Sequence, residues 1–299
     1  MNWNNIIHTI IFLSLTGPGI LGNTLILVRH VYMPALGTKK PVDLIIVHLA
    51  FSNMITICTT GIRDTATVFY FRNFLRDIGC KAVVFLTRMA RGLSICTTCL
   101  LSVLQAVTIS PRITLWTKLK PQTVCQVLPF IFVFWIINVL ISSNLLSYIK
   151  AGSDLNRSVA ATFIGHCYMP PPRHIIKWLF LSLMTLRDVI FQSLMGWSSG
   201  SMALHLYKHH KQVLYLYSSR SANNSPPEIR ATQSVLILMT CFLFFYWVDL
   251  IISFYQGFTV THEPILLNIK LFLELGYASF SPYILISRDV HPPNVLHAH

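Results

Sequence analysis

The sequence predicts an all-α membrane protein, built as a bundle of seven transmembrane helices. Three observations support this fold class: 54% of the 299 residues are hydrophobic, only 11% are charged, and the mean hydropathy is +0.59. A soluble domain carries about 25% charged residues, which it needs to cover a water-facing surface. The composition therefore excludes an ordinary soluble globular protein.

Seven apolar windows are each long enough to cross the hydrocarbon core, which takes about 20 helical residues. The predicted spans are 6–28, 42–62, 81–106, 124–147, 174–204, 232–255 and 265–286. The fifth range is too long for one straight crossing, so we expect that helix to tilt or to extend beyond the bilayer. The connecting segments are short, so residues 1–299 are expected to form one domain that recognises its ligand within the bundle or on its loops.

Positive charge predominates, with 23 Lys and Arg against 10 Asp and Glu and a formal net charge of +13. A nucleic-acid-binding protein carries such residues on one continuous basic face. Here they occur in short clusters between apolar runs, so the lipid bilayer is the predicted partner and nucleic acid is excluded.

The basic residues also predict the orientation, because cytoplasmic loops carry an excess of Lys and Arg. Eleven lie on the side that follows the first, third, fifth and seventh spans, against eight on the other side. We therefore expect the N-terminus outside and the C-terminus inside. Arg29 and His30 follow the first span and no basic segment precedes it, which favours a retained anchor over a cleaved signal peptide.

The segments predicted to lie outside carry two features that suit an oxidising, glycosylating compartment. Asn156 begins an Asn-Arg-Ser glycosylation acceptor between the fourth and fifth spans. Cys80 and Cys167 lie at the ends of outer polar segments, which permits a disulfide bond between them. Both features fall on the same predicted side as the N-terminus.

Ionisable residues inside the spans are the strongest indication of a functional site, because such residues are costly in a bilayer and usually face the bundle interior. They are Arg88, Arg91, Arg187, Asp188, Asp249, Lys270 and Glu274. Helical spacing places Arg88 with Arg91 on one face, and Lys270 with Glu274 on another. Two interpretations stay open and are compatible: a polar-lined cavity in the outer half of the bundle, or ion pairs that fix the packing of the helices.

Catalytic and metal-binding motifs are not evident. His205, His209 and His210 resemble one histidine box of a di-iron membrane enzyme, but such a site needs several boxes and no second one is present. The sequence also lacks the matched, broken helices in two halves that are typical of a transporter. We expect no enzyme activity, no metal and no cofactor.

Long motifs distributed over nearly the whole chain are specific enough to carry a family resemblance. The strongest is the unbroken string at 90–103, followed by Ile-Ser-Pro at 109–111, with further matches at 187–191, 199–202 and 281–289. In these residues the chain resembles the vomeronasal type-1 receptors, a family of pheromone-sensing G-protein-coupled receptors with a rhodopsin-like seven-helix architecture.

Departures from the wider rhodopsin-like class agree with that narrower family. Gly22-Asn23 matches the usual pair in the first span, but Asn53 stands where the class has the carboxylate of a sodium site. Gln105 is the centre of a Leu-Gln-Ala triplet that replaces the acidic-Arg-aromatic triplet, and Ser281-Pro282 replaces Asn-Pro. Without that Arg, any lock between the third and sixth spans must be built otherwise.

The resemblance implies a small volatile or semi-volatile ligand, an inhibitory-type heterotrimeric G protein and the plasma membrane. The residues nominated for the ligand pocket are Thr87, Arg88, Arg91, Arg187, Asp188, Asp249, Lys270 and Glu274. Those nominated for contact with the G protein are Gln105, Lys118, Lys120, Lys208, Lys211 and Arg230. Two alternatives stay open, a bitter-taste type of chemoreceptor and a small-solute transporter.

Overall fold

The computed structural model describes residues 3–32, 41–68, 77–109, 124–143, 150–151, 162–164, 167–169, 174–216, 227–258 and 264–289. Within these ranges seven helices are long and apolar enough to cross a membrane. The helices are α1 (Trp3–Tyr32), α2 (Pro41–Val68), α3 (Asp77–Ile109), α5 (Val124–Ser142), α7 (His174–Leu216), α8 (Pro227–Phe258) and α9 (Pro264–Asp289). The predicted seven-helix membrane fold is confirmed.

Six helices contain the whole of their predicted span, and the fourth is the exception. Its predicted range is 124–147, whereas α5 ends at Ser142. The backbone N–H of Ser143 donates to the carbonyl of Leu140 at 3.4 Å and closes a turn there. The run Ser142-Ser143-Asn144 explains this end, because Ser and Asn side chains compete for backbone hydrogen bonds. Residues 144–147 lie outside the described ranges.

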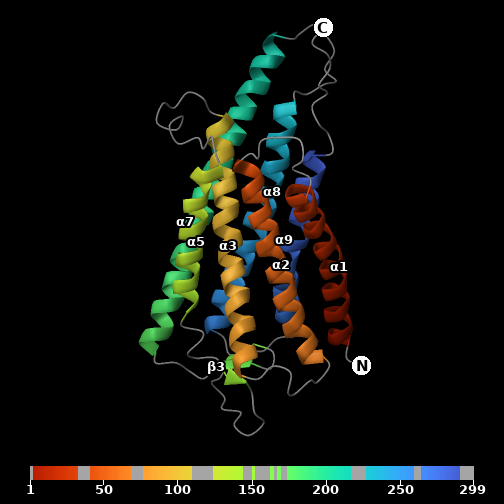
Figure 1. Ribbon diagram of the computed structural model, residues 1–299, viewed down its shortest axis with the longest axis vertical. Coiled ribbons are helices and arrows are strands. Elements are labelled where there is room, and N and C mark those ends of the chain that lie inside the picture. Colours follow the sequence, from red (N-terminus) through yellow and green to blue (C-terminus); the bar gives the residue numbers. More distant parts are fainter. Residues whose placement is uncertain are drawn as a thin grey trace.

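Three short strands between α5 and α7 were not predicted. They are β1 (Lys150–Ala151), β2 (Thr162–Ile164) and β3 (Cys167–Met169), and both β1 and β2 pair antiparallel with β3. Figure 1 shows this sheet at the lower end of the bundle, where α1 begins, while successive helices run in alternate directions. We call this end the sheet end and the opposite one the far end.

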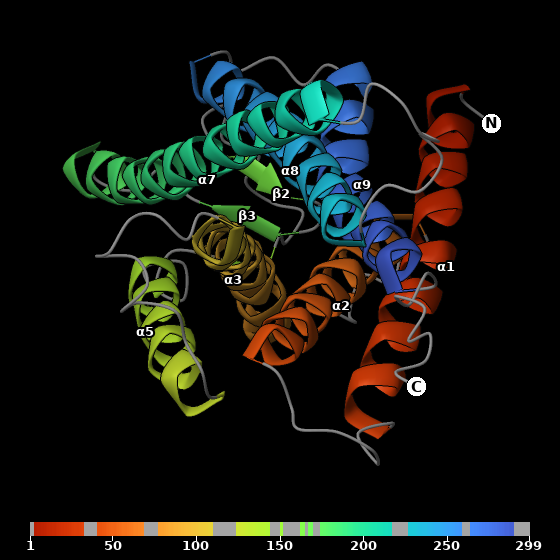
Figure 2. The ribbon, with the colours of Figure 1, turned by 90° about the horizontal axis from the view of Figure 1, so that it is seen from above.

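Helix α3 is the central helix of the bundle. It contacts α2, α5, α7 and α8, and β1 packs against it as well. In its apolar stretch 67% of the residues are buried, against 28% in α5 and 22% in α7. Figure 2 shows α5 at the periphery beside α3. Side chains on α3 are therefore the ones best placed to meet several other helices.

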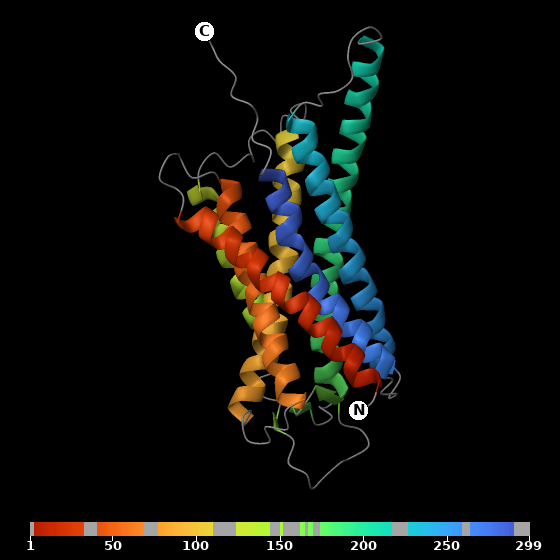
Figure 3. The ribbon, with the colours of Figure 1, turned by 90° about the vertical axis from the view of Figure 1, so that its right-hand side faces the viewer.

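Helix α7 has 43 residues, so it is about 65 Å long at 1.5 Å per residue. The hydrocarbon core of a bilayer is about 30 Å thick. Figure 3 shows that α7 extends beyond the neighbouring helices at the far end. Its C-terminal turns there carry the exposed Lys208 and Lys211.

The largest apolar core cluster lies toward the far end. Its fully buried members include Ile45 and Leu49 of α2, Leu101 of α3, and Leu238 and Phe242 of α8. The sheet half of α3, by contrast, carries the arginines that the sequence singled out. The two halves of the bundle therefore differ in the chemistry of their interiors.

Candidate functional site

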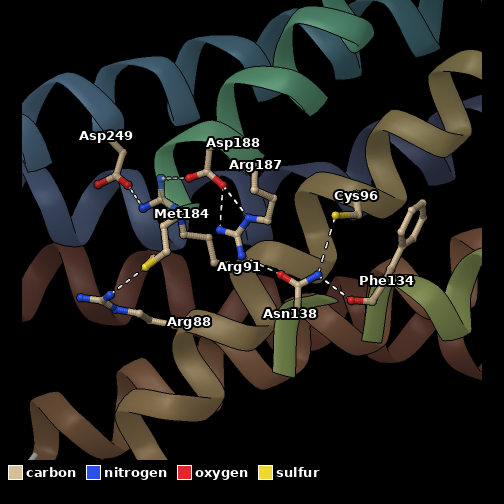
Figure 4. A network of polar contacts seen from close by, with 9 residues as sticks. All are labelled: Arg88, Arg91, Cys96, Phe134, Asn138, Met184, Arg187, Asp188 and Asp249. Atoms are coloured by element: carbon tan, nitrogen blue, oxygen red, sulfur yellow. Dashed lines mark hydrogen bonds and ion pairs between the residues drawn. The ribbon is translucent and has the colours of Figure 1, made fainter. Parts of the chain in front are cut away.

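Arg91 of α3 lies at the centre of a buried charged cluster (Figure 4). Its Nη1 donates to Oδ2 of Asp249 on α8, and its Nη2 lies 3.6 Å from Oδ2 of Asp188 on α7. The guanidinium also lies over the ring of Tyr246, 5.4 Å from its centroid. One cation thus joins three helices, because α3 presents it toward the gap between α7 and α8.

Arg187 extends the cluster from α7 toward α5. Its Nε and Nη2 donate to Oδ1 of Asp188 at 2.9 and 2.7 Å, and its Nη1 donates to Oδ1 of Asn138 at 2.7 Å. All three side chains are buried, with Arg187 and Asp188 at 5% and 4% exposure. Asp188 accepts hydrogen bonds from Arg187 and pairs with Arg91. The negative charge of this one carboxylate is therefore shared between two guanidinium groups.

Gly92 of α3 makes room for this arrangement. A Cβ at that position would overlap the side-chain amide of Asn138 and the Nη1 of Arg187. Glycine is the residue that lets neighbouring groups approach a helix this closely. The glycine next to Arg91 is therefore a requirement of the cluster, and it lies within the motif at 90–103.

A separate ion pair joins α2 to α9. Nη2 of Arg63 donates to Oε2 of Glu274 at 2.7 Å, and the two side chains are 18% and 15% exposed. The second predicted span ends at residue 62, whereas α2 continues through Arg63 to Val68. The nominated Lys270 lies one helical turn before Glu274 on α9.

Arg88 differs from the other arginines of the sheet half. Its Nη1 lies 2.9 Å from Sδ of Met184 on α7, and among the described residues it forms no ion pair. Figure 4 shows its guanidinium apart from the groups that bind Arg91. Three arginines and two aspartates on α3, α7 and α8 leave one positive charge in excess.

Buried polar atoms without a hydrogen-bond partner occur beside the cluster. Within the described ranges they include Oδ1 of Asp249, Nε of Arg91, and both amide atoms of Gln192 on α7. Gln192 is only 1% exposed and lies one turn beyond Asp188. Such atoms in a folded protein usually bind water or a ligand.

Thr87 behaves differently from the other pocket candidates. Its Oγ1 donates to the backbone carbonyl of Val83 one turn earlier in α3, at 2.8 Å. The hydroxyl is therefore engaged within its own helix.

Neutral side chains make the corresponding contacts nearer the far end. Nε1 of Trp135 on α5 donates to Nε2 of His48 on α2 at 2.9 Å, and Nδ1 of His48 lies 2.9 Å from Oγ1 of Thr97 on α3. Because Nε2 accepts a hydrogen bond, His48 is neutral with its proton on Nδ1. At the position of the missing sodium-site carboxylate, Asn53 donates to Oγ of Ser281 at 2.9 Å.

The residues nominated for the G protein are only partly described. Gln105 is half-buried near the end of α3, and Lys208 and Lys211 are exposed on α7. Lys118, Lys120 and the side chain of Arg230 lie outside the described part of the chain. The described members all belong to the far end.

At the sheet end, Cys80 is buried near the start of α3 and is disulfide-bonded. Its pairing with Cys167 stays a prediction, and so does glycosylation of Asn156, which lies outside the described ranges. Cys167 opens β3 and pairs in register with Ala151 of β1, the strand that packs against α3.

An apolar groove lies apart from the charged cluster. A groove of about 320 Å³ lies between α1 and α9 and is lined mainly by isoleucines, with Asn268 and Phe272. No group of three or more His, Cys, Asp or Glu suited to a metal ion occurs among the residues described.

Three neutral participants were missed by the sequence analysis, namely Asn138, Met184 and Gln192. These side chains carry no charge, so the criterion used above, the high free-energy cost of a charged group in a membrane, does not select them. A usable signal exists only for Asn138 and Gln192, because a polar amide in a transmembrane segment is expected to hydrogen-bond across helices.

Seven helices that are long and apolar enough to cross a membrane, joined through buried charged groups, define a seven-helix membrane protein. The chain belongs to the vomeronasal organ pheromone receptor family, whose family model matches residues 6–298. It is therefore a G-protein-coupled receptor and not an enzyme, and it is a multi-pass membrane protein.

Known relatives agree with that assignment. Vomeronasal type-1 receptor 4 of Homo sapiens is 31% identical over 93% of this chain and 92% of its own length. Vomeronasal type-1 receptor 100 of Rattus norvegicus is 33% identical over 99% of the chain and 92% of its own length. Olfactory receptor class A-like protein 1 of Danio rerio is 32% identical over 93% of the chain and 88% of its own length.

Proposed function

We propose that this receptor binds a small volatile or semi-volatile molecule in the sheet half of the bundle and activates an inhibitory-type heterotrimeric G protein at the far end. The observation that carries the ligand site is the set of unpartnered buried polar atoms on Asp249, Arg91 and Gln192. They belong to three different helices, so a ligand that bonds to them would favour one arrangement of those helices over another.

The orientation follows the charge bias of the connecting segments, with the sheet end outside the cell at the plasma membrane. The disulfide-bonded Cys80 supports it, because disulfides form in oxidising compartments. The far end then faces the cytoplasm, where the exposed Lys208 and Lys211 on the projecting part of α7 are available to a G protein. Gln105 lies at the same end, on the central helix.

The activation switch we propose is the pair of contacts that Arg91 makes in the buried charged cluster, one with Asp249 and one with Asp188. Since Arg91 has a carboxylate on α8 and another on α7, it can exchange partners when those helices move. That arrangement ties α3 to α8 without the acidic-Arg-aromatic triplet of other receptors, which is replaced here around Gln105.

The test is a G-protein dissociation assay in cells with measured surface expression. The receptor is challenged with a panel of small volatile alcohols, ketones, esters and acids, with an inhibitory-type Gα subunit in one arm and a stimulatory one in another. We expect at least one compound to activate the inhibitory arm only. Asp249→Asn is expected to abolish that response, whereas Asp43→Asn, at the start of α2, retains it.

Three outcomes would contradict the proposal. A response through the stimulatory arm alone would overturn the choice of G protein. A surface-expressed receptor that moves a labelled solute across the membrane and activates neither arm would favour the transporter alternative. A response confined to bitter-tasting compounds would favour the bitter-taste alternative for the ligand class.

A further inference from the structure

Arg88 is the one arginine of the α3, α7 and α8 cluster whose charge is not neutralised within it. Among the described residues its hydrogen bond is to Sδ of Met184, at 2.9 Å. A thioether sulfur is a weak acceptor, whereas a guanidinium offers five N–H donors. The contact with Met184 therefore leaves most of the bonding capacity of Arg88 unused.

The position of Arg88 makes this unusual. It lies ten residues after Ile78, where the membrane span of α3 begins, which is about 15 Å along the helix. A lone cation at such a depth is costly, and charged residues there usually pair with one another or face a water-filled cavity. Its contact with Met184 on α7 holds the side chain between the helices instead of toward the membrane surface.

The neighbouring carboxylates do not supply the missing charge. Asp249 binds Arg91, and Asp188 binds both Arg91 and Arg187. Glu274 binds Arg63 of α2 at 2.7 Å. All three acids are engaged by other arginines, so the excess positive charge of the cluster rests on Arg88.

We propose that Arg88 binds an anionic group of the ligand, a carboxylate or a sulfate ester on a small organic molecule. This inference rests on the proposed ligand site in the sheet half and names the chemical class that the site takes. A planar guanidinium binds such groups through two parallel hydrogen bonds, which are short and strong. The anionic group would replace Met184 as the acceptor of Arg88, because a thioether side chain is flexible and its sulfur is a weak acceptor.

The experiment measures binding without a G protein. Full-length receptor is placed in nanodiscs of neutral phosphatidylcholine, and its thermal unfolding midpoint is measured with hexanoate, octanoate, benzoate and hexyl sulfate. The matched neutral probes are the methyl esters and hexanol, and inorganic sulfate tests a bare anion. We expect at least one organic anion to raise the midpoint, with an affinity at least about tenfold greater than that of its neutral counterpart.

Three variants locate the effect. Arg88→Gln is expected to remove the preference for the anion and to leave the affinity for the neutral probe unchanged. Arg88→Lys keeps the charge without the two-pronged geometry, so a weakened preference is expected. Lys81→Gln, two turns earlier on the same helix, is the matched control and is expected to behave as the wild type.

Met184→Leu keeps the folded receptor testable should Arg88→Gln fail to fold. It removes the sulfur acceptor while leaving Arg88 in place, and we expect anion binding to be retained or strengthened.

Equal midpoint shifts from acids and their esters, no shift from any organic anion, or an undiminished preference in Arg88→Gln would each overturn the proposal. In a second arm the nanodiscs contain anionic phosphatidylglycerol and no probe is added. A rise of the midpoint there that is absent in Arg88→Gln would assign Arg88 to a lipid headgroup and overturn it as a ligand contact.

The two proposals fail separately. Anion binding that depends on Arg88 but activates no G protein supports the anionic subsite and contradicts the proposed signalling function. Activation by neutral odorants, without a preference for any organic anion over its ester in the wild type, supports the signalling function and overturns the anionic subsite.

Discussion

In the sheet half of the bundle, buried pairs of arginine with a carboxylate join the helices. In the far half, the interior contacts described above are apolar or neutral polar, and His30 lies 3.9 Å from Asp43 at the edge of the bundle, where the Asp43 side chain is 41% exposed. Arg91 bridges to Asp188 and Asp249 in the sheet half. In the far half, Trp135 bonds to His48 within a continuous apolar cluster. The two halves share the same helices, so movement in one must reach the other through them.

This contrast indicates which half of the bundle can hold an element with two alternative conformations. A closely packed apolar core resists gradual deformation, so it transmits helix movement as a rigid body. An arginine between two carboxylates has discrete alternatives instead, because it can strengthen one ion pair and release the other. We therefore place the switch in the sheet half and assign the transmission of its movement to the far half.

The largest effect is expected from Asp249→Ala. It leaves Arg91 with Asp188 as its remaining carboxylate partner and increases the excess of buried positive charge. Removing one partner of a buried ion pair costs about 3–5 kcal/mol. We expect a severe loss of surface expression and a lower thermal unfolding midpoint in nanodiscs. The control is Asp43→Asn, whose side chain is 41% exposed and whose loss should change the unfolding free energy by less than about 1 kcal/mol.

A double variant distinguishes stability from switching. Replacing both partners of a buried pair by apolar residues is often neutral or stabilising, so Arg91→Met with Asp249→Leu should recover most of the lost surface expression. We expect this receptor to remain silent in the G-protein assay. Recovery of ligand-driven signalling in the double variant would contradict the proposed switch.

Gly92→Ala is expected to have the next largest effect. The added Cβ overlaps the side chains of Asn138 and Arg187. Both side chains must therefore move, which disturbs the hydrogen bond from Arg187 on α7 to Asn138 on α5. Overpacking of this kind costs about 1–3 kcal/mol. At Gly200 of α7 nothing lies within 4 Å of an added Cβ, so Gly200→Ala is the matched control. Equal unfolding midpoints for the two variants would show that the cluster tolerates a wider separation at α3.

Trp135→Phe tests the far half. The change removes the donor to Nε2 of His48 and keeps an aromatic ring in place, so we expect a loss of about 1 kcal/mol in the unfolding free energy. Trp197 of α7 is 76% exposed, and Trp197→Phe is expected to change that free energy by less than about 0.5 kcal/mol. Ligand affinity should be unchanged in both variants. A change of affinity in Trp135→Phe would show that binding reaches the far half.

Much of the fold could be predicted from the sequence, because each helix needs a long apolar window and the bilayer supplies a fixed length to compare it with. The strands could not, since β1 has only two residues and all three depend on pairing across the segment between α5 and α7. The extension of α2 through Arg63 was also missed, because an apolar window ends where the charge begins rather than where the helix does.

The members of the buried charged cluster could be predicted from the sequence as residue types, but the pairs that they form could not. The buried charges of α3, α7, α8 and α9 could be identified because each is costly in a membrane. Which charges meet depends on how every helix is rotated, and the sequence specifies that only through spacing within one helix. The spacing put Arg88 and Arg91 on one face, yet Arg91 lies between carboxylates and Arg88 against Met184.

Thr87→Val is expected to have the smallest effect, and it tests how closely the ligand approaches the face of α3 before Arg88. The Thr87 hydroxyl donates to the carbonyl of Val83 within the same helix, so its replacement by an isosteric methyl should change stability by less than about 0.5 kcal/mol. That corresponds to roughly a twofold change in an equilibrium constant. We expect ligand affinity in the nanodisc assay to stay within that range, in contrast to Arg88→Gln at the next position. A tenfold loss in Thr87→Val would mean that the hydroxyl turns from Val83 to the ligand, and the pocket would then extend nearer to the sheet end than Arg88.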